Sequence, residues 1–146
     1  MTTSEEKYVL AVEDNPADVR VLERVFEEMD RSIPIHSINT GTQALEFVSS
    51  NFGDRQIPPV LVLLDLNLPG TDGRSILKEL KTDEVLCSIP VVILTTSNSR
   101  EDRTWCYETG ANSYIVKPNN QELYRRRLQL VQQYWLDAVA LPGEGS

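Results

Sequence analysis

The stretch at residues 60–73, VLVLLDLNLPGTDG, decides the fold of this chain. Its first five residues are all apolar, which is typical of a central strand in a parallel sheet, because helices cover both faces of such a strand. Asp65 follows these five residues directly, and the proline and glycines after it mark a turn-rich loop. The stretch therefore predicts a buried parallel strand with a carboxylate at its carboxyl end.

Four further runs rich in apolar or β-branched residues lie along the chain, at 8–12, 35–38, 91–94 and 114–116. Between the runs lie stretches with helical spacing or capping residues, which begin near Pro16, Gly41, Arg74, Arg100 and Gln121. The last of these stretches continues to about residue 139. Regular alternation of strands and helices indicates βαβ units. The predicted fold class is therefore α/β, with a doubly wound, five-stranded parallel sheet flanked by five helices.

The composition indicates one ordinary globular domain. The chain has 146 residues, of which 40% are hydrophobic and 25% charged, and its formal net charge is −8. This excess of acid repels polyanions, so nucleic-acid binding is disfavoured. No apolar run approaches the roughly 20 residues of a membrane helix and no secretory signal is present, so we expect a cytoplasmic protein without membrane contact. We expect the domain to span residues 7–141, between a flexible N-terminus (1–6) and a loose tail (142–146).

Polar residues stand at the ends of four predicted strands. They are Glu13 and Asp14 after the first strand, Asp65 after the third, Thr95 at the fourth and Lys117 after the fifth. The carboxyl ends of parallel strands meet at one edge of a sheet, so these side chains should converge in one pocket. Clustered carboxylates favour Mg²⁺, and an aspartate beside this ion can act as a nucleophile toward phosphorus. Each residue alone also fits a role as a helix cap, turn residue or solvated charge, but their coincidence favours a site.

At these residues the sequence resembles the response-regulator receiver domain. Glu13 and Asp14 look like its acidic pair, Asp65 in LLDLNLPGTDG its phosphoacceptor, Thr95 in VVILTTS its switch hydroxyl, and Lys117 in YIVKP its lysine before proline. The resemblance covers roughly residues 7–136. It implies the flavodoxin-like strand order 2-1-3-4-5.

The resemblance also implies a chemistry for the pocket. The protein would accept a phosphoryl group on Asp65 with Mg²⁺ as the cofactor, and it would not be a turnover enzyme. The ion would be bound by Asp14, Asp65 and the backbone carbonyl of Asn67, with Glu13 acting through a water molecule.

Four residues in or just after the fourth and fifth strands receive phosphoryl-binding or switch roles from the same resemblance. Lys117 would bind the phosphoryl group, and Tyr114 matches an aromatic side chain that changes rotamer when Thr95 moves toward that group. Thr96 stands where a small residue is commoner, beside the expected path of the water that would hydrolyse the phosphoryl group. The family also implies a cis bond between Lys117 and Pro118.

Three stretches carry a closer resemblance: DNPADVRVLERVFEE at 14–28, LLDLNLPGTDGRSIL at 63–77 and QQYWLDAVALP at 132–142. Together they resemble the single-domain response regulators that serve cyanobacterial phytochrome histidine kinases. The resemblance implies a histidine kinase of the phytochrome type as the partner that donates the phosphoryl group.

The last predicted helix has more apolar residues than one side needs against a sheet, and its three arginines at 125–127 are clustered on an acidic protein. A core stripe with solvated charges is one interpretation. The other is a homodimer through the fourth helix, fifth strand and fifth helix, present always or formed on phosphorylation. Its apolar anchors would be Tyr134, Trp135 and Leu136. The arginines would pair with acids such as Glu101, Asp102 or Glu108.

Two other functions remain as alternatives. An aspartyl-phosphate phosphatase of the haloacid dehalogenase type also uses an aspartate nucleophile, Mg²⁺, a threonine and a lysine. That family needs a second acid two positions after the nucleophile, where this chain has Asn67. A receiver-like scaffold that works without phosphorylation is disfavoured because all the expected reactive groups are present.

Overall fold

Five parallel strands form one sheet in the computed structural model, which describes residues 7–29 and 33–142. In chain order they are β1 (Val9–Val12), β2 (Ile35–Ile38), β3 (Leu61–Leu64), β4 (Val91–Thr95) and β5 (Ser113–Val116). Their order across the sheet is β2-β1-β3-β4-β5, and every neighbouring pair is parallel. The predicted fold class and strand order are confirmed.

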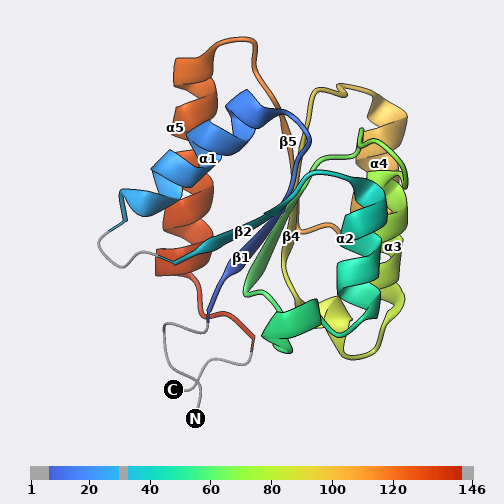
Figure 1. Ribbon diagram of the computed structural model, residues 1–146. Helices are drawn as coiled ribbons and strands as arrows, with labels where there is room; N and C mark the ends of the chain where they lie inside the picture. Colours follow the sequence, from blue (N-terminus) through green and yellow to red (C-terminus); the bar gives the residue numbers. More distant parts are fainter. Residues whose placement is uncertain (1–6, 30–32, 143–146) are drawn as a thin grey trace.

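In the described part of the chain, five α-helices cover the two faces of the sheet. They are α1 (Pro16–Glu27), α2 (Gly41–Ser49), α3 (Gly73–Thr82), α4 (Arg100–Thr109) and α5 (Gln121–Gln133). Figure 1 shows α1 and α5 on one side of the sheet and α2, α3 and α4 on the other. Two short 3₁₀-helices, η2 (Gly53–Arg55) and η3 (Leu86–Ser88), precede β3 and β4.

The strands alternate their side chains between two apolar layers. On β1, Leu10 and Val12 join the layer with α2 and α3, whereas Val9 and Ala11 join the layer with α1 and α5. All four residues of β3 are buried, as its apolar run predicts. Full burial of a Val or Leu side chain contributes about 1.5–3 kcal/mol, so both layers hold the carboxyl ends of the strands in place.

Each α-helix begins with a side-chain cap that follows the end of a strand. The capping oxygens accept hydrogen bonds from N–H groups in the first helical turn, and they belong to Asn15, Thr40, Asp72, Ser99 and Asn120. Pro16 is the first residue of α1, where its missing N–H costs nothing. The caps therefore fix where each helix begins after its strand.

Two glycines let the loop after β3 approach its neighbours closely. A Cβ atom on Gly73 would lie 2.2 Å from the carbonyl oxygen of Asp65, and one on Gly41 would lie 1.5 Å from the carbonyl oxygen of Thr71. The Gly73 N–H also donates to the carbonyl oxygen of Leu66 at 3.0 Å. The start of α3 is therefore held against the backbone that carries Asp65.

The last helix differs from its prediction near its end. It is α-helical only to Gln133, and a π-helical turn, η4 (Tyr134–Ala138), replaces the rest. The Val139 N–H donates to the Tyr134 carbonyl oxygen at 3.0 Å and closes this wider turn. Helical spacing alone does not distinguish the two kinds of turn, because both keep the chain coiled.

The predicted cis bond between Lys117 and Pro118 is wrong, because no peptide bond in the described residues is cis. The trans form is lower in energy even before proline. Lys117 still reaches the strand-end pocket described below, so the trans bond does not prevent that placement.

The predicted N-terminal segment at 1–6 and most of the predicted tail at 142–146 lie outside the described residues. The domain boundaries therefore stay a prediction. None of the described helices combines the length and apolar character that crossing a membrane requires.

Candidate phosphoryl-acceptor and metal site

Glu13 and Asp65 lie close together because their strands are paired. Val12 of β1 lies opposite Leu64 of β3, and the Asp65 N–H donates to the Val12 carbonyl oxygen at 3.0 Å. The two acids that follow these strands are only 4% and 6% exposed. With the exposed Asp14, they each place one oxygen within 4.8 Å of the others. One divalent cation can bridge such a group, and carboxylate oxygens are the ligands that Mg²⁺ prefers.

The Lys117 ammonium lies inside this carboxylate cluster. The Lys117 N–H donates to the Thr95 carbonyl oxygen at 2.7 Å, which fixes where the lysine leaves the sheet. Its Nζ donates to Asp65 at 2.9 Å, to Asp18 at 3.0 Å and to Glu13. The lysine side chain is 6% exposed. Three charge-assisted hydrogen bonds therefore hold the ammonium beside the predicted phosphoacceptor.

Burial changes the protonation behaviour of the pocket. It raises the pKa of Glu13 to about 7, although the hydrogen bond and positive charge of Lys117 oppose this shift. Burial alone would lower the pKa of Lys117, but the hydrogen bond and charge of Glu13 and the charge of Asp65 raise it above its ordinary value. The lysine therefore stays charged at neutral pH. The carboxylates of the cluster outnumber this ammonium, which favours a divalent cation.

Asp18 belongs to this pocket and was not anticipated from the sequence. It lies in the first turn of α1, where its N–H donates to the Asn15 cap. Acids are common in the first turn because they interact favourably with the helix dipole. In the sequence, Asp18 therefore looks like an ordinary residue of a helix N-terminus. The sequence feature that could have indicated its role is its position. Only three residues separate β1 from α1, so the first turn of α1 lies next to the strand ends.

Tyr124 is a second residue near the pocket that could not be predicted from the ends of the strands, because it lies on a helix. Its side chain, on α5, is 3% exposed, and its hydroxyl makes no hydrogen bond with the described residues. Burial raises the pKa of Tyr124. The charge of Lys117 lowers this pKa and the charge of Asp18 raises it. The first turn of α5 therefore brings a buried hydroxyl close to the charged cluster.

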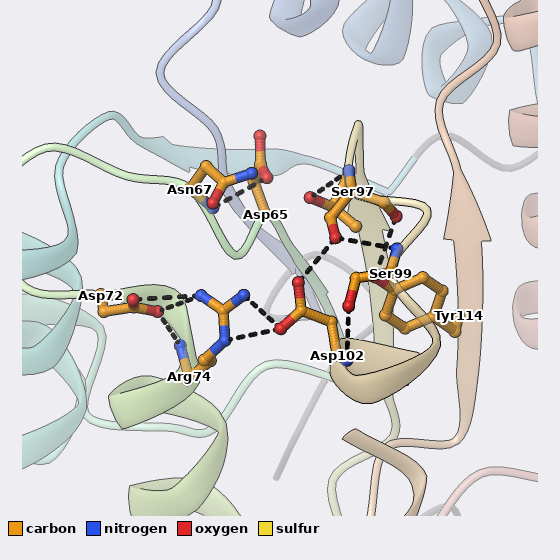
Figure 2. A network of polar contacts seen from close by, with 9 residues as sticks. Asp65, Asn67, Asp72, Arg74, Ser97, Ser99, Asp102 and Tyr114 are labelled. Carbon is orange, nitrogen blue, oxygen red and sulfur yellow. Dashed lines mark hydrogen bonds and ion pairs between the residues drawn. The ribbon is translucent and has the colours of Figure 1, made fainter. Parts of the chain in front are cut away.

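Asn67 and Thr96 lie on the exposed loops after β3 and β4. The Asn67 N–H donates to Asp65 Oδ1 at 3.1 Å, so this residue borders the pocket (Figure 2). Its predicted role as a metal ligand through its carbonyl stays a prediction. The same holds for the predicted influence of Thr96 on hydrolysis.

Thr95 and Tyr114 are linked to each other through Ser97, a residue that no pattern in the sequence singles out. Thr95 is fully buried, and its hydroxyl oxygen accepts the Ser97 N–H at 3.3 Å. The Tyr114 hydroxyl donates to the Ser97 carbonyl oxygen at 3.0 Å (Figure 2). Both proposed switch residues therefore contact one residue of the β4–α4 loop.

The predicted dimer anchors lie far from the pocket, because α5 runs from the carboxyl edge of the sheet to the opposite edge (Figure 1). Tyr134 is 55% exposed, whereas Trp135 and Leu136 pack against the core layer of α1 and α5. Two of the charges predicted to pair across the dimer have partners in their own chain. Arg125 pairs with Glu28, and Asp102 pairs with Arg74.

A parallel α/β fold with an acidic pocket and a buried lysine at its strand ends is the arrangement that the resemblance to phosphoryl-accepting receiver domains implies. The sequence matches the response regulator receiver domain family over residues 9–129, and the chain belongs to this family. Receivers are typically phosphoacceptors rather than turnover enzymes. The acidic pocket of this chain groups three carboxylates that could hold a metal ion.

Two known relatives match the chain over most of its length. Response regulator Rcp1 of Synechocystis is 36% identical over 137 residues, which cover 93% of each chain. The probable methanogenesis regulatory protein FilR2 of Methanothrix harundinacea is 38% identical over 135 residues, covering 92% of this chain and 87% of FilR2. The chain is thus related to phytochrome response regulators, and a histidine kinase is the implied partner.

Two solved structures support the same relationship. The phosphorylated cyanobacterial phytochrome response regulator RcpA has a TM-score of 0.88 at 33% identity, covering 94% of this chain and 99% of RcpA. The Mn²⁺-bound form of Rcp1 has a TM-score of 0.88 at 36% identity, with the same coverage.

Proposed function

We propose that Asp65 accepts a phosphoryl group from a histidine kinase, with Mg²⁺ as the cofactor. The observation that carries the proposal is the buried Asp65 carboxylate, which lies 2.9 Å from the Lys117 ammonium and within 4.8 Å of oxygens from Glu13 and Asp14. A nucleophile in this setting has a fixed cation and potential metal ligands beside it. The phosphorylated and Mn²⁺-bound states of the two relatives support the same chemistry.

In the proposed transfer, a carboxylate oxygen of Asp65 attacks the phosphorus of a phosphohistidine. The new P–O bond forms as the P–N bond breaks, and the histidine nitrogen keeps the electron pair. Lys117 offsets the charge of the phosphoryl oxygens. Asp14, Asp65 and the Asn67 carbonyl would hold Mg²⁺, with Glu13 acting through water, and the ion supplies further charge neutralisation.

Thr95 and Tyr114 transmit the change to the surface in this proposal. The Thr95 hydroxyl moves toward the phosphoryl group, and Tyr114 changes position with the loop that holds its hydroxyl. Thr96 lies beside Thr95 and affects access of the hydrolysing water. The surface formed by α4, β5 and α5 therefore differs between the two states.

The donor in this proposal is a phytochrome-type histidine kinase in the cytoplasm, because RcpA is a phytochrome response regulator. The chain acts as a stoichiometric acceptor, not as a turnover enzyme. Asn67 stands where a haloacid dehalogenase-type phosphatase needs an acid, and this disfavours the enzymatic alternative.

Incubation with Mg²⁺ and acetyl phosphate tests the proposal directly. We expect a mass gain of one phosphoryl group that hydroxylamine removes, as it does from an acyl phosphate. Continuous phosphate release without an accumulating acyl phosphate would instead support the phosphatase alternative. No mass gain with the folded protein would support the phosphorylation-independent scaffold.

Replacing Asp14 with alanine should weaken Mg²⁺ binding by about 10-fold or more, equivalent to about 1.4 kcal/mol. The reason is that the substitution removes a carboxylate ligand while the Lys117 contacts remain. Calorimetric titration with Mg²⁺ measures this affinity. The exposed Asp54, in η2, provides a matched control, since Asp54→Ala removes the same charge outside the pocket. Equal affinity in the wild type and Asp14→Ala would rule out this ligand assignment.

We propose that the chain forms a homodimer, with or without phosphorylation, through the face of α4, β5 and α5, including the η4 turn that follows α5. Trp135 and Leu136 pack against the core, so replacing them would also affect folding. Tyr134 is 55% exposed and is therefore the anchor best suited to a test. Tyr134→Arg should shift the sedimentation coefficient toward that of a monomer. Val85→Arg makes the same kind of change at an apolar surface position that is even more exposed (77%), the N-cap of η3, and should leave association unchanged. A wild type that stays monomeric at micromolar concentrations in both states would contradict the dimer.

A further inference from the structure

Ser97, in the loop between β4 and α4, contacts both proposed switch residues through its backbone. Its N–H donates to the Thr95 hydroxyl oxygen at 3.3 Å, and its carbonyl oxygen accepts the Tyr114 hydroxyl at 3.0 Å. Figure 2 shows Ser97 next to Tyr114 on one side and Asp102 on the other. The position of this one residue therefore affects the resting positions of both Thr95 and Tyr114.

The Ser97 side chain is tied to α4 and, through it, to α3. Ser97 Oγ donates to Asp102 Oδ2 at 2.6 Å, and Arg74 Nη2 and Nε donate to Asp102 Oδ1 at 2.5 Å and 3.2 Å. The Arg74 and Asp102 side chains are 30% and 22% exposed, so water screens this pair less than an open surface pair. Arg74, Asp102 and Ser97 are referred to below as the latch.

The other end of the latch is fixed to the loop that carries Asp65. Arg74 is the second residue of α3 and also donates to the Asp72 carboxylate at 3.0 Å. The preceding Gly73 donates to the Leu66 carbonyl oxygen at 3.0 Å and leaves no room for a Cβ beside Asp65. The latch therefore connects the rigid backbone next to the phosphoacceptor with the loop that follows Thr95.

We propose that the latch holds the β4–α4 loop in its resting position and sets how readily Thr95 and Tyr114 switch. The inference rests on the proposed phosphorylation of Asp65. When Thr95 moves toward a phosphoryl group, its hydrogen bond with the Ser97 N–H must stretch or Ser97 must move with it. The hydrogen bond from Ser97 Oγ to Asp102 opposes this movement of Ser97. Arg74, Asp102 and Ser97 are positioning residues, since the described contacts place none of them on the phosphoryl acceptor itself.

Weakening the latch should therefore favour the switched state before any phosphoryl group arrives. The probe is beryllofluoride with Mg²⁺, which mimics a phosphoryl group on an aspartate. Ser97→Ala removes the hydroxyl and keeps the Ser97 backbone contacts, and Asp102→Ala removes the contacts of the latch with both Ser97 and Arg74. Each variant should bind beryllofluoride about 5-fold or more tightly than the wild type, because less of the binding energy is used to break the resting state.

A second measurement separates this effect from simple destabilisation. In ¹⁹F NMR of fluorotyrosine-labelled protein, the Tyr114 signal of the unliganded variants should move toward its beryllofluoride-bound position. Glu28→Ala breaks a different arginine–carboxylate pair, Arg125 with Glu28, on the opposite face of the sheet. This control should change neither the affinity nor the Tyr114 signal, whatever its effect on the unfolding temperature.

Two outcomes lead to different conclusions. If the wild type binds beryllofluoride and both latch variants bind it equally or more weakly with an unmoved Tyr114 signal, the latch proposal is overturned. If the folded wild type neither binds beryllofluoride nor gains a phosphoryl group from acetyl phosphate, the proposed function itself fails.

Discussion

Replacing Asp65 with asparagine should abolish phosphoryl incorporation, lowering its rate by about 100-fold or more, since loss of a nucleophile removes the reacting atom itself. The amide has nearly the same shape as the carboxylate but is a far weaker nucleophile. The variant should remain folded, because Lys117 keeps Glu13 and Asp18 as partners. Other carboxylates of the pocket should not replace Asp65, because none of them ends the central strand.

Intact-protein mass spectrometry after incubation with Mg²⁺ and acetyl phosphate measures this loss. Asp54→Asn makes the same chemical change at an exposed site outside the pocket and should label like the wild type. Peptide mapping then identifies the labelled residue in the wild type. Undiminished labelling of the Asp65 variant at any other residue would show that the phosphoacceptor is assigned incorrectly.

Replacing Lys117 with methionine should lower the free energy of unfolding by about 3 kcal/mol in the absence of divalent cations. The ammonium is the hydrogen-bond partner of Glu13, Asp18 and Asp65, and the first and last of these are almost fully buried. Without it, these carboxylates repel one another in a poorly solvated pocket. Mg²⁺ should therefore stabilise the variant more than it stabilises the wild type, because the ion then supplies the missing positive charge.

Urea unfolding with Mg²⁺ and with a chelator measures both quantities. Lys81→Met is the matched control, because Lys81 is also partly buried but donates to the carbonyl oxygens of Cys87 and Ile89 and to Asn112. That variant should lose stability, but its response to Mg²⁺ should equal that of the wild type. An equal Mg²⁺ response in Lys117→Met would contradict the role assigned to the ammonium.

The strand ends could be placed from the sequence because one rule governs them all. Asp65 follows an apolar run long enough to be a central strand, and parallel register then brings Glu13 beside it. Lys117 follows the fifth strand in the same way. Each of these placements depends only on local pattern and on the common edge of a parallel sheet.

Asp18 and Tyr124, which were missed, reach the site from helices, where local pattern gives no such rule. Asp18 has the ordinary features of an acid in a first helical turn, and only the packing of α1 directs it to Lys117. Asp102 was expected to pair with an arginine of α5, but it pairs with Arg74, 28 positions away on α3. That pairing depends on how two helices lie on one face of the sheet, which helical periodicity does not encode.

The position of Lys117 among three carboxylates has a consequence for ion selectivity. The pocket already contains a desolvated monovalent counterion that is covalently part of the chain. A potassium or sodium ion would gain little by competing with it, since it would bring the same charge and would also have to lose its own hydration shell. A divalent ion brings twice the charge, so we expect the pocket to prefer divalent over monovalent ions by charge, without needing a cavity of a particular size.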